Sequence, residues 1–226
     1  MTVTQADITA LWDKLCARVK TGDRFAGLFA FQAEGGALVL SAHLATAGRI
    51  DTLDVPLPPG AAGYPALTPR LGAAFWYERL IHDRFGVIPE GHPRLAPLIG
   101  PGPPEEHALP RHVEGYGIFT IPHGPVRSGV VEAIEYLVET PGEAIPHLNM
   151  RVFYKHRGLA DRFAGMTAGD GVLLAERGEG IASVAHALAF CHAVETIAGC
   201  QPPPAATRLT RRPTRWPRSA RIGRDR

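Results

Sequence analysis

The 226-residue chain contains few cysteines, and their spacing excludes several kinds of site. Cys16, Cys191 and Cys200 lie far apart, and none belongs to a C-x-x-C motif. Such spacing excludes a disulfide framework and a cysteine-rich zinc or iron–sulfur site within this chain. The ten histidines are scattered without an H-E-x-x-H arrangement, so we expect the chain to bind no metal.

Long apolar runs and common catalytic motifs are also absent. No segment approaches the roughly 18 apolar residues of a membrane-spanning helix, and residues 1–20 have an amphipathic pattern unlike that of a signal peptide. There is no G-x-S-x-G elbow, and we expect no catalytic residue. These absences predict a soluble protein of a reducing compartment, at most peripheral to a membrane and without a transmembrane segment.

Positive charge is scarce outside the end of the chain. Of the 24 basic and 22 acidic residues, eight arginines and one aspartate follow residue 204, which leaves 16 basic and 21 acidic side chains in the body. The body therefore offers no basic surface for nucleic acid, and we expect no nucleic-acid partner. Residues 201–226 are predicted to form a disordered arginine- and proline-rich tail, with a nucleic-acid-binding arm as the alternative interpretation.

The apolar periodicity predicts a mixture of helices and strands, which is an α+β fold. In the first half we expect these elements: helices at 5–20 and 71–85, a hairpin of strands at 25–32 and 37–44, and loops at 55–66 and 89–112. In the second half we expect these: strands at 116–122, 130–139 and 145–154, and helices at 156–165 and 181–199. Gly86 is expected to end the second helix, and Gly-Asp-Gly at 169–171 to form a tight turn before a strand-like segment.

The first motif is YERLIHDRFGVIPEGHPRLAPLI, residues 77–99. It resembles the E-R-E-x-x-D-x-F-G-x-x-x-x-G-H-P pattern of the C-type subunit of complex I, which energy-converting hydrogenases share in their fused large subunits. The matching residues are Glu78, Arg79, Asp83, Phe85, Gly86, Gly91, His92 and Pro93. We expect the segment to expose paired charges beside a rigid turn, an arrangement that suits docking of a neighbouring subunit.

Three later segments resemble, in order, the start of the D-type subunit of complex I and of [NiFe]-hydrogenase large subunits. They are IPHGPVRSGVVEAIEYLVET, FYKHRGLADRFAG and AERGEGIASVAHALAFCHAVETIAG. The matching residues are Gly124, Pro125, Gly129, Tyr154, His156, Arg157, Gly158, Glu176, Arg177, Gly180, Ile181, Ala185 and His186. With the first motif they follow the fused order of group-four [NiFe]-hydrogenases such as hydrogenase-4 and formate hydrogenlyase.

The metal-ligand cysteines of that family are replaced in this chain. In a hydrogenase the C-G-I-C cysteines bind nickel and iron as thiolates, whereas Glu179 and Ala182 stand at those two positions here. Alanine has no ligand atom, and one glutamate cannot replace a bridging pair of thiolates. The sequence also ends soon after residue 199, before a second cysteine pair would appear. We therefore expect a degenerate site without a [NiFe] centre.

The D-type subunit of complex I also lacks these cysteines and contributes to a quinone cavity. By resemblance, Ser128, Tyr154, His156 and Arg157 are candidates to border such a cavity. Ser128 stands where the family has a hairpin histidine, which removes a quinone hydrogen-bond donor. The alternative for His156 and Arg157 is a salt-bridged helix start, with Glu176 as partner.

The resemblances imply the following division: a domain like the C-type subunit at 1–100, a proline-rich linker at 101–115, the N-terminal part of a domain like the D-type subunit or a hydrogenase large subunit at 116–200, and the tail at 201–226. They imply a peripheral oxidoreductase subunit of an NADH-quinone oxidoreductase-like or hydrogenase-like complex, on the inner face of the cytoplasmic membrane. Iron–sulfur clusters and quinone would reside in or at partners, namely an iron–sulfur subunit and membrane subunits. The alternative is a non-catalytic scaffold or assembly factor of such a complex.

Overall fold

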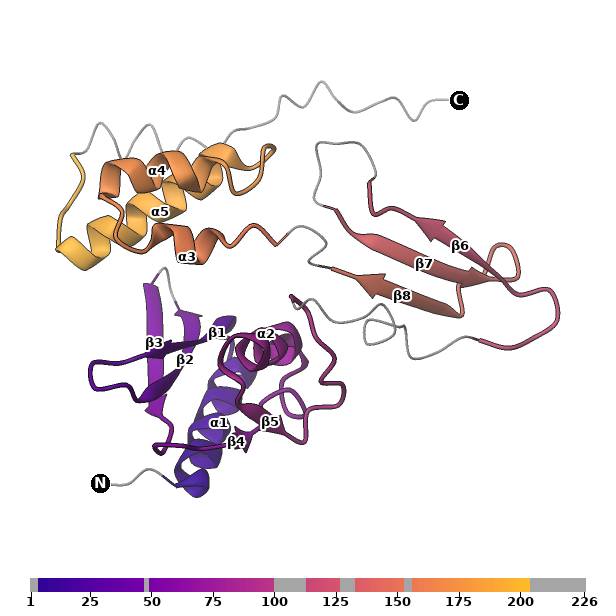
Figure 1. The fold of residues 1–226 in the computed structure, drawn as a ribbon, viewed down its shortest axis with the longest axis horizontal. Helices are drawn as coiled ribbons and strands as arrows, with labels where there is room; N and C mark the ends of the chain where they lie inside the picture. Colours follow the sequence, from indigo (N-terminus) through magenta and orange to yellow (C-terminus); the bar gives the residue numbers. More distant parts are fainter. Residues whose placement is uncertain (1–3, 47–48, 100–112, 127–132, 153–155, 204–226) are drawn as a thin grey trace. The chain divides into compact units, whose positions relative to one another are not determined.

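The computed structural model describes residues 4–46, 49–99, 113–126, 133–152 and 156–203. The chain divides into two units, residues 1–112 and 113–226. Each unit combines helices with a three-stranded antiparallel sheet (Figure 1), which confirms the predicted α+β class. No helix within the described ranges is both long enough and apolar enough to cross a membrane. Most of the predicted linker and tail lies outside these ranges, so both stay predictions.

The first unit begins with helix α1, Gln5–Lys20, at the predicted residues. The Thr4 hydroxyl accepts a hydrogen bond from the Asp7 N–H, and the Asp7 carboxylate accepts one from the Thr4 N–H. This reciprocal capping satisfies two N–H groups that would otherwise lack partners at the helix start. The face of α1 that turns to the core buries Ile8, Trp12 and Leu15.

The first sheet supplies the other side of this core. Its strands are β1 (Arg24–Gln32), β2 (Leu38–Thr46) and β3 (Arg49–Pro56), in the order β1-β2-β3. Leu40, Ala42 and Leu44 alternate along one face of β2 and pack in one cluster with Trp12 of α1. The predicted hairpin of β1 and β2 is confirmed. Strand β3 was not predicted, and its last two residues fall in the predicted 55–66 loop.

The rest of the first unit surrounds a second helix. Its elements are β4 (Gly63–Pro65), a 3-10 turn η1 (Gly72–Ala74), α2 (Phe75–Phe85) and β5 (Ile88–Glu90). Gly86 ends α2 with φ +72° and donates its N–H to the His82 carbonyl at 2.8 Å, which confirms the predicted helix end. Strands β4 and β5 pair in parallel, so the predictions of irregular structure at these short segments are wrong.

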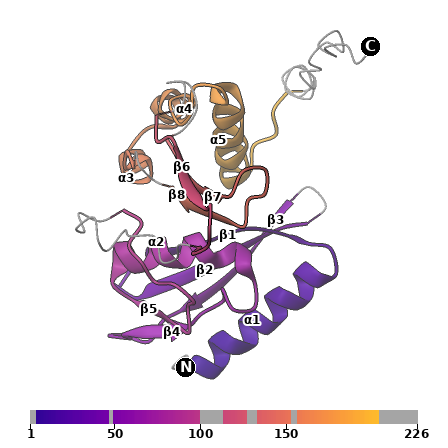
Figure 2. The same cartoon turned by 90° about the vertical axis from the view of Figure 1, so that its right-hand side faces the viewer.

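The second unit contains a meander of strands followed by helices. Its elements are β6 (Phe119–His123), β7 (Glu135–Thr140), β8 (His147–Arg151), α3 (Leu159–Phe163), α4 (Ala168–Glu176) and α5 (Ser183–Ala198). The strand order is β6-β7-β8, with antiparallel pairing throughout. Each strand overlaps a predicted strand, and α3 and α5 lie within the predicted helices. Helices α4 and α5 lie side by side (Figure 2).

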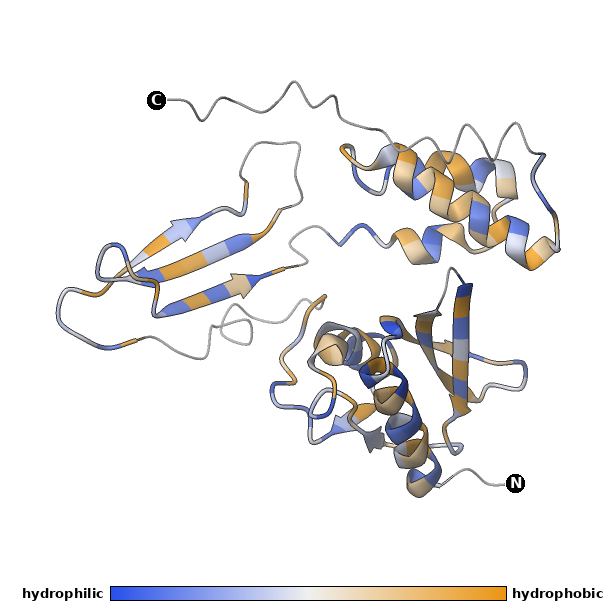
Figure 3. Ribbon diagram, turned by 180° about the vertical axis from the view of Figure 1, so that it is seen from behind, coloured by the Kyte–Doolittle hydropathy of each residue, from blue (hydrophilic) through white to orange (hydrophobic). Residues whose placement is uncertain are grey.

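Helix α4 corrects a prediction from the glycines at 169–171. These residues lie inside α4 and do not form a turn before a strand. Thr167 caps the helix by accepting a hydrogen bond from Asp170 N–H, and Gly171 lets the Phe190 ring of α5 approach the α4 backbone. Phe190 also stacks on Phe163, with 5.3 Å between ring centroids. The second glycine is therefore a packing residue, and α4 and α5 are largely apolar in Figure 3.

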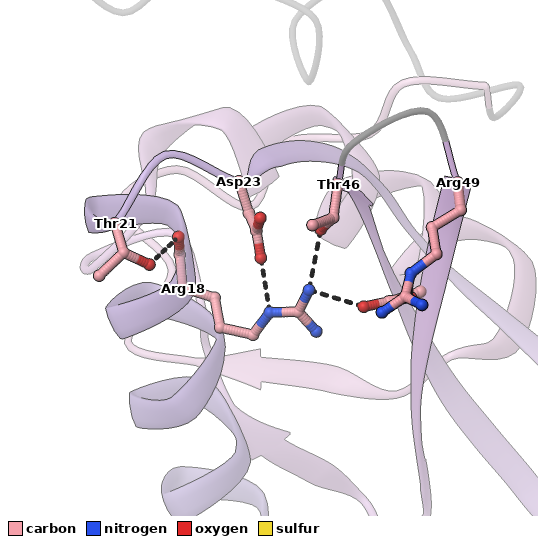
Figure 4. A network of polar contacts seen from close by, with 6 residues as sticks. Arg18, Thr21, Asp23, Thr46 and Arg49 are labelled. Atoms are coloured by element: carbon pink, nitrogen blue, oxygen red, sulfur yellow. Dashed lines mark hydrogen bonds and ion pairs between the residues drawn. The ribbon is translucent and has the colours of Figure 1, made fainter.

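In the first unit, a single arginine joins α1 to the end of the sheet (Figure 4). Arg18 Nε donates to Asp23 Oδ2 at 2.6 Å, and a terminal nitrogen of Arg18 donates to Thr46 Oγ1 at 2.9 Å and to Asp51 Oδ2 at 2.7 Å. Thr46 ends β2 and Asp51 lies in β3. The hydrogen bond from Arg18 lowers the pKa of the Asp51 carboxyl below its usual value. The network thereby fixes the helix against the sheet through charge-assisted hydrogen bonds.

Candidate functional site

Glu78 of the first motif is fully buried in α2 and serves as an internal hydrogen-bond acceptor. One carboxylate oxygen accepts the Leu67 N–H at 2.7 Å. The other accepts the Thr68 N–H at 3.0 Å and the Thr68 hydroxyl. A buried carboxylate is tolerated when hydrogen bonds replace its water, and here three donors do so. Glu78 thereby fixes the loop that leads from β4 to η1.

Arg79, the next residue of the motif, is only 5% exposed and binds the segment on the other side of α2. Its Nε donates to the Ala96 carbonyl at 2.6 Å, and a terminal nitrogen donates to the Pro97 carbonyl at 3.0 Å. Its guanidinium carbon lies 5.4 Å and 5.2 Å from the ring centroids of Phe75 and Trp76. Burial lowers the pKa of Arg79 to about 10, so the side chain remains charged at neutral pH.

Asp83 and His92 complete the same arrangement. Asp83 Oδ2 accepts the Leu98 N–H at 2.6 Å and the Ile99 N–H at 3.0 Å. His92 Nδ1 accepts the N–H of Arg94 at 3.1 Å, which assigns the ring proton to Nε2 and makes Nε2 the donor to the Phe75 carbonyl at 3.2 Å. Burial lowers the pKa of His92, which favours this neutral form. Gly91, with φ +83°, gives the turn that brings His92 back to α2.

The motif is therefore a clamp that ties two loops to α2. The expectation that it exposes its charges is wrong for Glu78, Arg79 and Asp83, whose partners are chiefly main-chain groups of the same unit. Phe85 packs against the core, whereas Pro93 is exposed. Docking by this motif stays a prediction, and its buried residues can contribute to it only by holding the surface in shape.

Arg157 performs a similar task in the second unit. Its two terminal nitrogens donate to the carbonyls of Arg177, at 3.1 Å, and of Gly178. These carbonyls lie where α4 ends, so the Arg157 guanidinium supplies donors to acceptors that the helix leaves without intrahelical partners. Two of the three hydrogenase-like segments are thereby joined directly.

The turn held by Arg157 contains Glu179 and Ala182, the two residues predicted to stand at degenerate metal-ligand positions. Glu179 Oε2 lies 4.0 Å from His186 Nε2, and a Cβ on Gly178 would come within 3.6 Å of the His186 ring. Ala182 stands at the start of α5 without a side-chain cap, and its carbonyl accepts the His186 N–H. In this turn the side chains near each other are one carboxylate, from Glu179, and one imidazole, from His186. Thiolate ligands are missing from it, so the residues do not fit a [NiFe] centre.

The quinone-cavity candidates are only partly described. Ser128 and Tyr154 lie outside the described residues, and His156 is exposed. The hydrogen bonds of Arg157 given above go to main-chain carbonyls at the end of α4, and not to Glu176, which the alternative interpretation names as a salt-bridge partner at a helix start. Within the described part of the chain, no group of three or more His, Cys, Asp and Glu side chains could hold a metal ion.

Sequence reasoning missed the partners of both motifs. The groups that Glu78, Arg79 and Arg157 bind are mostly main-chain N–H and carbonyl groups, which do not depend on residue type. A second omission is the hydrogen-bonded set of Ser41, His43 and Asp54 on the first sheet, which no motif joins in the sequence.

Comparison with known proteins gives matches that agree with the two motifs. Residues 1–115 match the family model described as respiratory-chain NADH dehydrogenase, 30 Kd subunit. The chain is 30% identical over 165 residues to hydrogenase-4 component G of Escherichia coli, an overlap of 62% of this chain and 30% of that protein. It is 30% identical over 166 residues to formate hydrogenlyase subunit 5 of Escherichia coli, covering 62% and 29%.

A further match reaches NADH-quinone oxidoreductase itself. The chain is 33% identical over 85 residues to a D-type subunit of the NADH-quinone oxidoreductase of Thermodesulfovibrio yellowstonii, covering 38% of this chain and 20% of that protein. In all three relatives, the matched region spans less than a third of the relative's length.

Proposed function

Because its first 115 residues match the family model, the chain belongs to the respiratory-chain NADH dehydrogenase 30 kDa subunit family, and we propose that it is a peripheral subunit of a complex I-like or hydrogenase-type electron-transfer complex. The observation that carries the proposal is the presence of both family segments in one chain, which relatives from hydrogenase-4 and formate hydrogenlyase share. The internal clamp of Glu78 and Arg79 supports it, because that part of the family pattern has a physical task here.

The role we propose is to position neighbouring subunits at the cytoplasmic face of the membrane. Redox chemistry would belong to the partners: an iron–sulfur subunit holding the clusters, and membrane subunits with access to quinone. Glu179 and Ala182 support this division of labour, since neither can supply a thiolate to a metal. Bordering of a quinone cavity by Ser128, Tyr154, His156 and Arg157 remains a prediction that rests on family resemblance.

Affinity purification tests the proposal directly. The tagged full chain is purified from its own organism after mild detergent extraction of membranes, and the co-purifying proteins are identified by mass spectrometry. We expect iron–sulfur and membrane subunits of one complex in fixed ratio. Recovery of the chain alone, at low salt and with the membrane fraction intact, would contradict the proposal.

A second candidate is an assembly factor without a place in the active complex. The degenerate positions Glu179 and Ala182 favour it, because a chain that has lost a metal site can still keep the shape that partners recognise. Under this alternative, deletion of the gene prevents assembly, but the purified complex lacks the chain. Native gels of the deletion strain, with antibodies to the chain in the assembled complex, separate the two roles.

A further inference from the structure

The first sheet has a second face that does not belong to the core. Strand pairing places Phe29 opposite Ser41 and Ser41 opposite Asp54, and it places Phe31 opposite Val39 on the next rung. Because side chains alternate along strands, these residues share the face opposite Leu40 and Ala42. We call this the outer sheet face, defined by Phe29, Phe31, Val39, Ser41, His43 and Asp54. Phe29 and Phe31 are 48% and 46% exposed on it, whereas Val39 and Ser41 of the central strand are buried.

Phe29 is held in place although half of it is exposed. Its ring centroid lies 5.2 Å from that of His43 and 5.7 Å from that of Tyr77, with edge-to-face geometry in both pairs. A Cβ on Gly27 would come within 2.8 Å of the Phe29 ring, so the ring lies over a backbone that only glycine leaves open. A fixed aromatic ring with a free surface loses little conformational entropy on binding, which is typical of interface hot spots.

A chain of hydrogen bonds fixes a carboxylate on the same face as this ring, on the opposite outer strand of the sheet. Ser41 Oγ donates to Asp54 Oδ1 at 2.5 Å, and since its one proton is used there, it accepts from His43 Nε2 at 3.0 Å. Burial lowers the pKa of His43, so the imidazole is neutral at neutral pH and leaves the Asp54 charge uncompensated. Asp54 is exposed, and no described residue forms an ion pair with it.

We propose that the outer sheet face binds a neighbouring subunit of the complex through an arginine that pairs with Asp54, while apolar residues beside that arginine cover Phe29 and Phe31. This inference rests on the proposed function and names the surface and the partner chemistry. A planar guanidinium can form two hydrogen bonds with a carboxylate and can also stack on an aromatic ring. The ammonium group of a lysine is a compact point charge and lacks this planar geometry.

Charge argues against the other occupants of this face. A surface of anionic lipids attracts clusters of basic residues, and the outer sheet face presents a carboxylate. A second copy packed symmetrically on the same face would bring two Asp54 carboxylates toward each other in an apolar setting, which is unfavourable. A cationic protein segment satisfies both the carboxylate and the aromatic rings.

Site-directed photo-cross-linking in the native complex tests the inference. A photoreactive phenylalanine analogue replaces Phe31 in the full chain, the complex is purified after irradiation, and the cross-linked peptide is sequenced. We expect one subunit of the complex, at an apolar segment that contains an arginine. The same analogue at Ile88, which is 46% exposed on β5, is the matched control and should not reach that segment.

Charge exchange then tests the pairing itself. Asp54→Arg should lower the cross-link yield at least about tenfold, and replacing the partner arginine with glutamate should restore it. Asp54→Asn keeps an acceptor for Ser41 and removes the charge, so it gives the same test if Asp54→Arg fails to fold. Cross-links to lipid, to a second copy or to residues 113–226 overturn the inference, as does an unchanged yield in both variants. If complex subunits co-purify but none is cross-linked, the inference fails and the proposed function stands; if none co-purifies, both fail.

Discussion

Replacing Glu78 with alanine tests whether the buried carboxylate of α2 holds the first unit together. The change removes an acceptor from two main-chain N–H groups and one hydroxyl, at Leu67 and Thr68, in a place without solvent. A buried donor left without a partner costs about 1–3 kcal/mol. Since the Thr68 hydroxyl can rotate to another acceptor, we expect the free energy of unfolding to fall by about 3–5 kcal/mol, a large part of the stability of a small domain.

Urea unfolding of the full chain, followed by tryptophan fluorescence, measures this loss. Trp12 is 1% exposed in the core of the first unit, so its emission reports unfolding of that unit. With a urea dependence of about 2 kcal/mol per molar, the midpoint should fall by about 2 M. Glu34→Ala, at an exposed glutamate in the β1–β2 turn, is the matched control and should change the stability by less than about 0.5 kcal/mol. A loss below about 1 kcal/mol for Glu78→Ala would refute the clamp.

Three further predictions concern other parts of the chain. Gly171→Ala should destabilise the α4–α5 pair by about 1–3 kcal/mol, because its Cβ would overlap the Phe190 ring, whereas Gly169→Ala in the same helix should stabilise it by up to about 1 kcal/mol; thermal unfolding followed by circular dichroism should show opposite shifts. Arg157→Ala should speed hydrogen exchange at residues 178–186, while His156→Ala should leave it unchanged; equal rates in all three proteins would contradict the capping role. Asp23 and Asp51 have lowered pKa values in the folded state, so their contribution to stability is present above about pH 4 and is lost as the pH falls through those lowered values; Arg18→Ala should weaken this acid sensitivity in urea unfolding at a series of pH values.

The elements that could be predicted are those whose pattern depends on local physics. Helix α1 has a capping pair and a regular apolar face, and α2 ends at a glycine that adopts a positive φ. Strand β3 could not be recognised because the acidic side chains of Asp51 and Asp54 interrupt its apolar pattern. Asp51 pairs with Arg18, whereas Asp54 accepts a hydrogen bond from Ser41 and keeps a charge that no described residue pairs with. The alternation of apolar and polar residues along a strand does not show which residues of other strands or helices such side chains will bind.

In the candidate site, the residues could be predicted from the sequence, but their burial and their partners could not. The motif that contains Glu78 and Arg79 could be found in the sequence, but its placement could not, since charged side chains are almost never fully buried unless they are paired. Their partners are chiefly main-chain groups at 67–68 and 96–97, which leave no trace in residue identity. The prediction at Gly171 was wrong for a similar reason. Glycine is typical of turns, but here it allows the Phe190 ring of α5 to approach the α4 backbone, and the sequence around Gly171 does not show that contact.

The turn that contains Glu179 and Ala182 links these observations to function. A metal site depends on two kinds of residue. Some bind the metal, and others hold the turn that carries those ligands in its conformation. Arg157 holds the end of α4 through two main-chain carbonyls, and that task requires no metal. The turn can therefore keep its shape without cysteines at residues 179 and 182. A subunit whose contribution is shape can keep this architecture, and that is the contribution we propose for this chain.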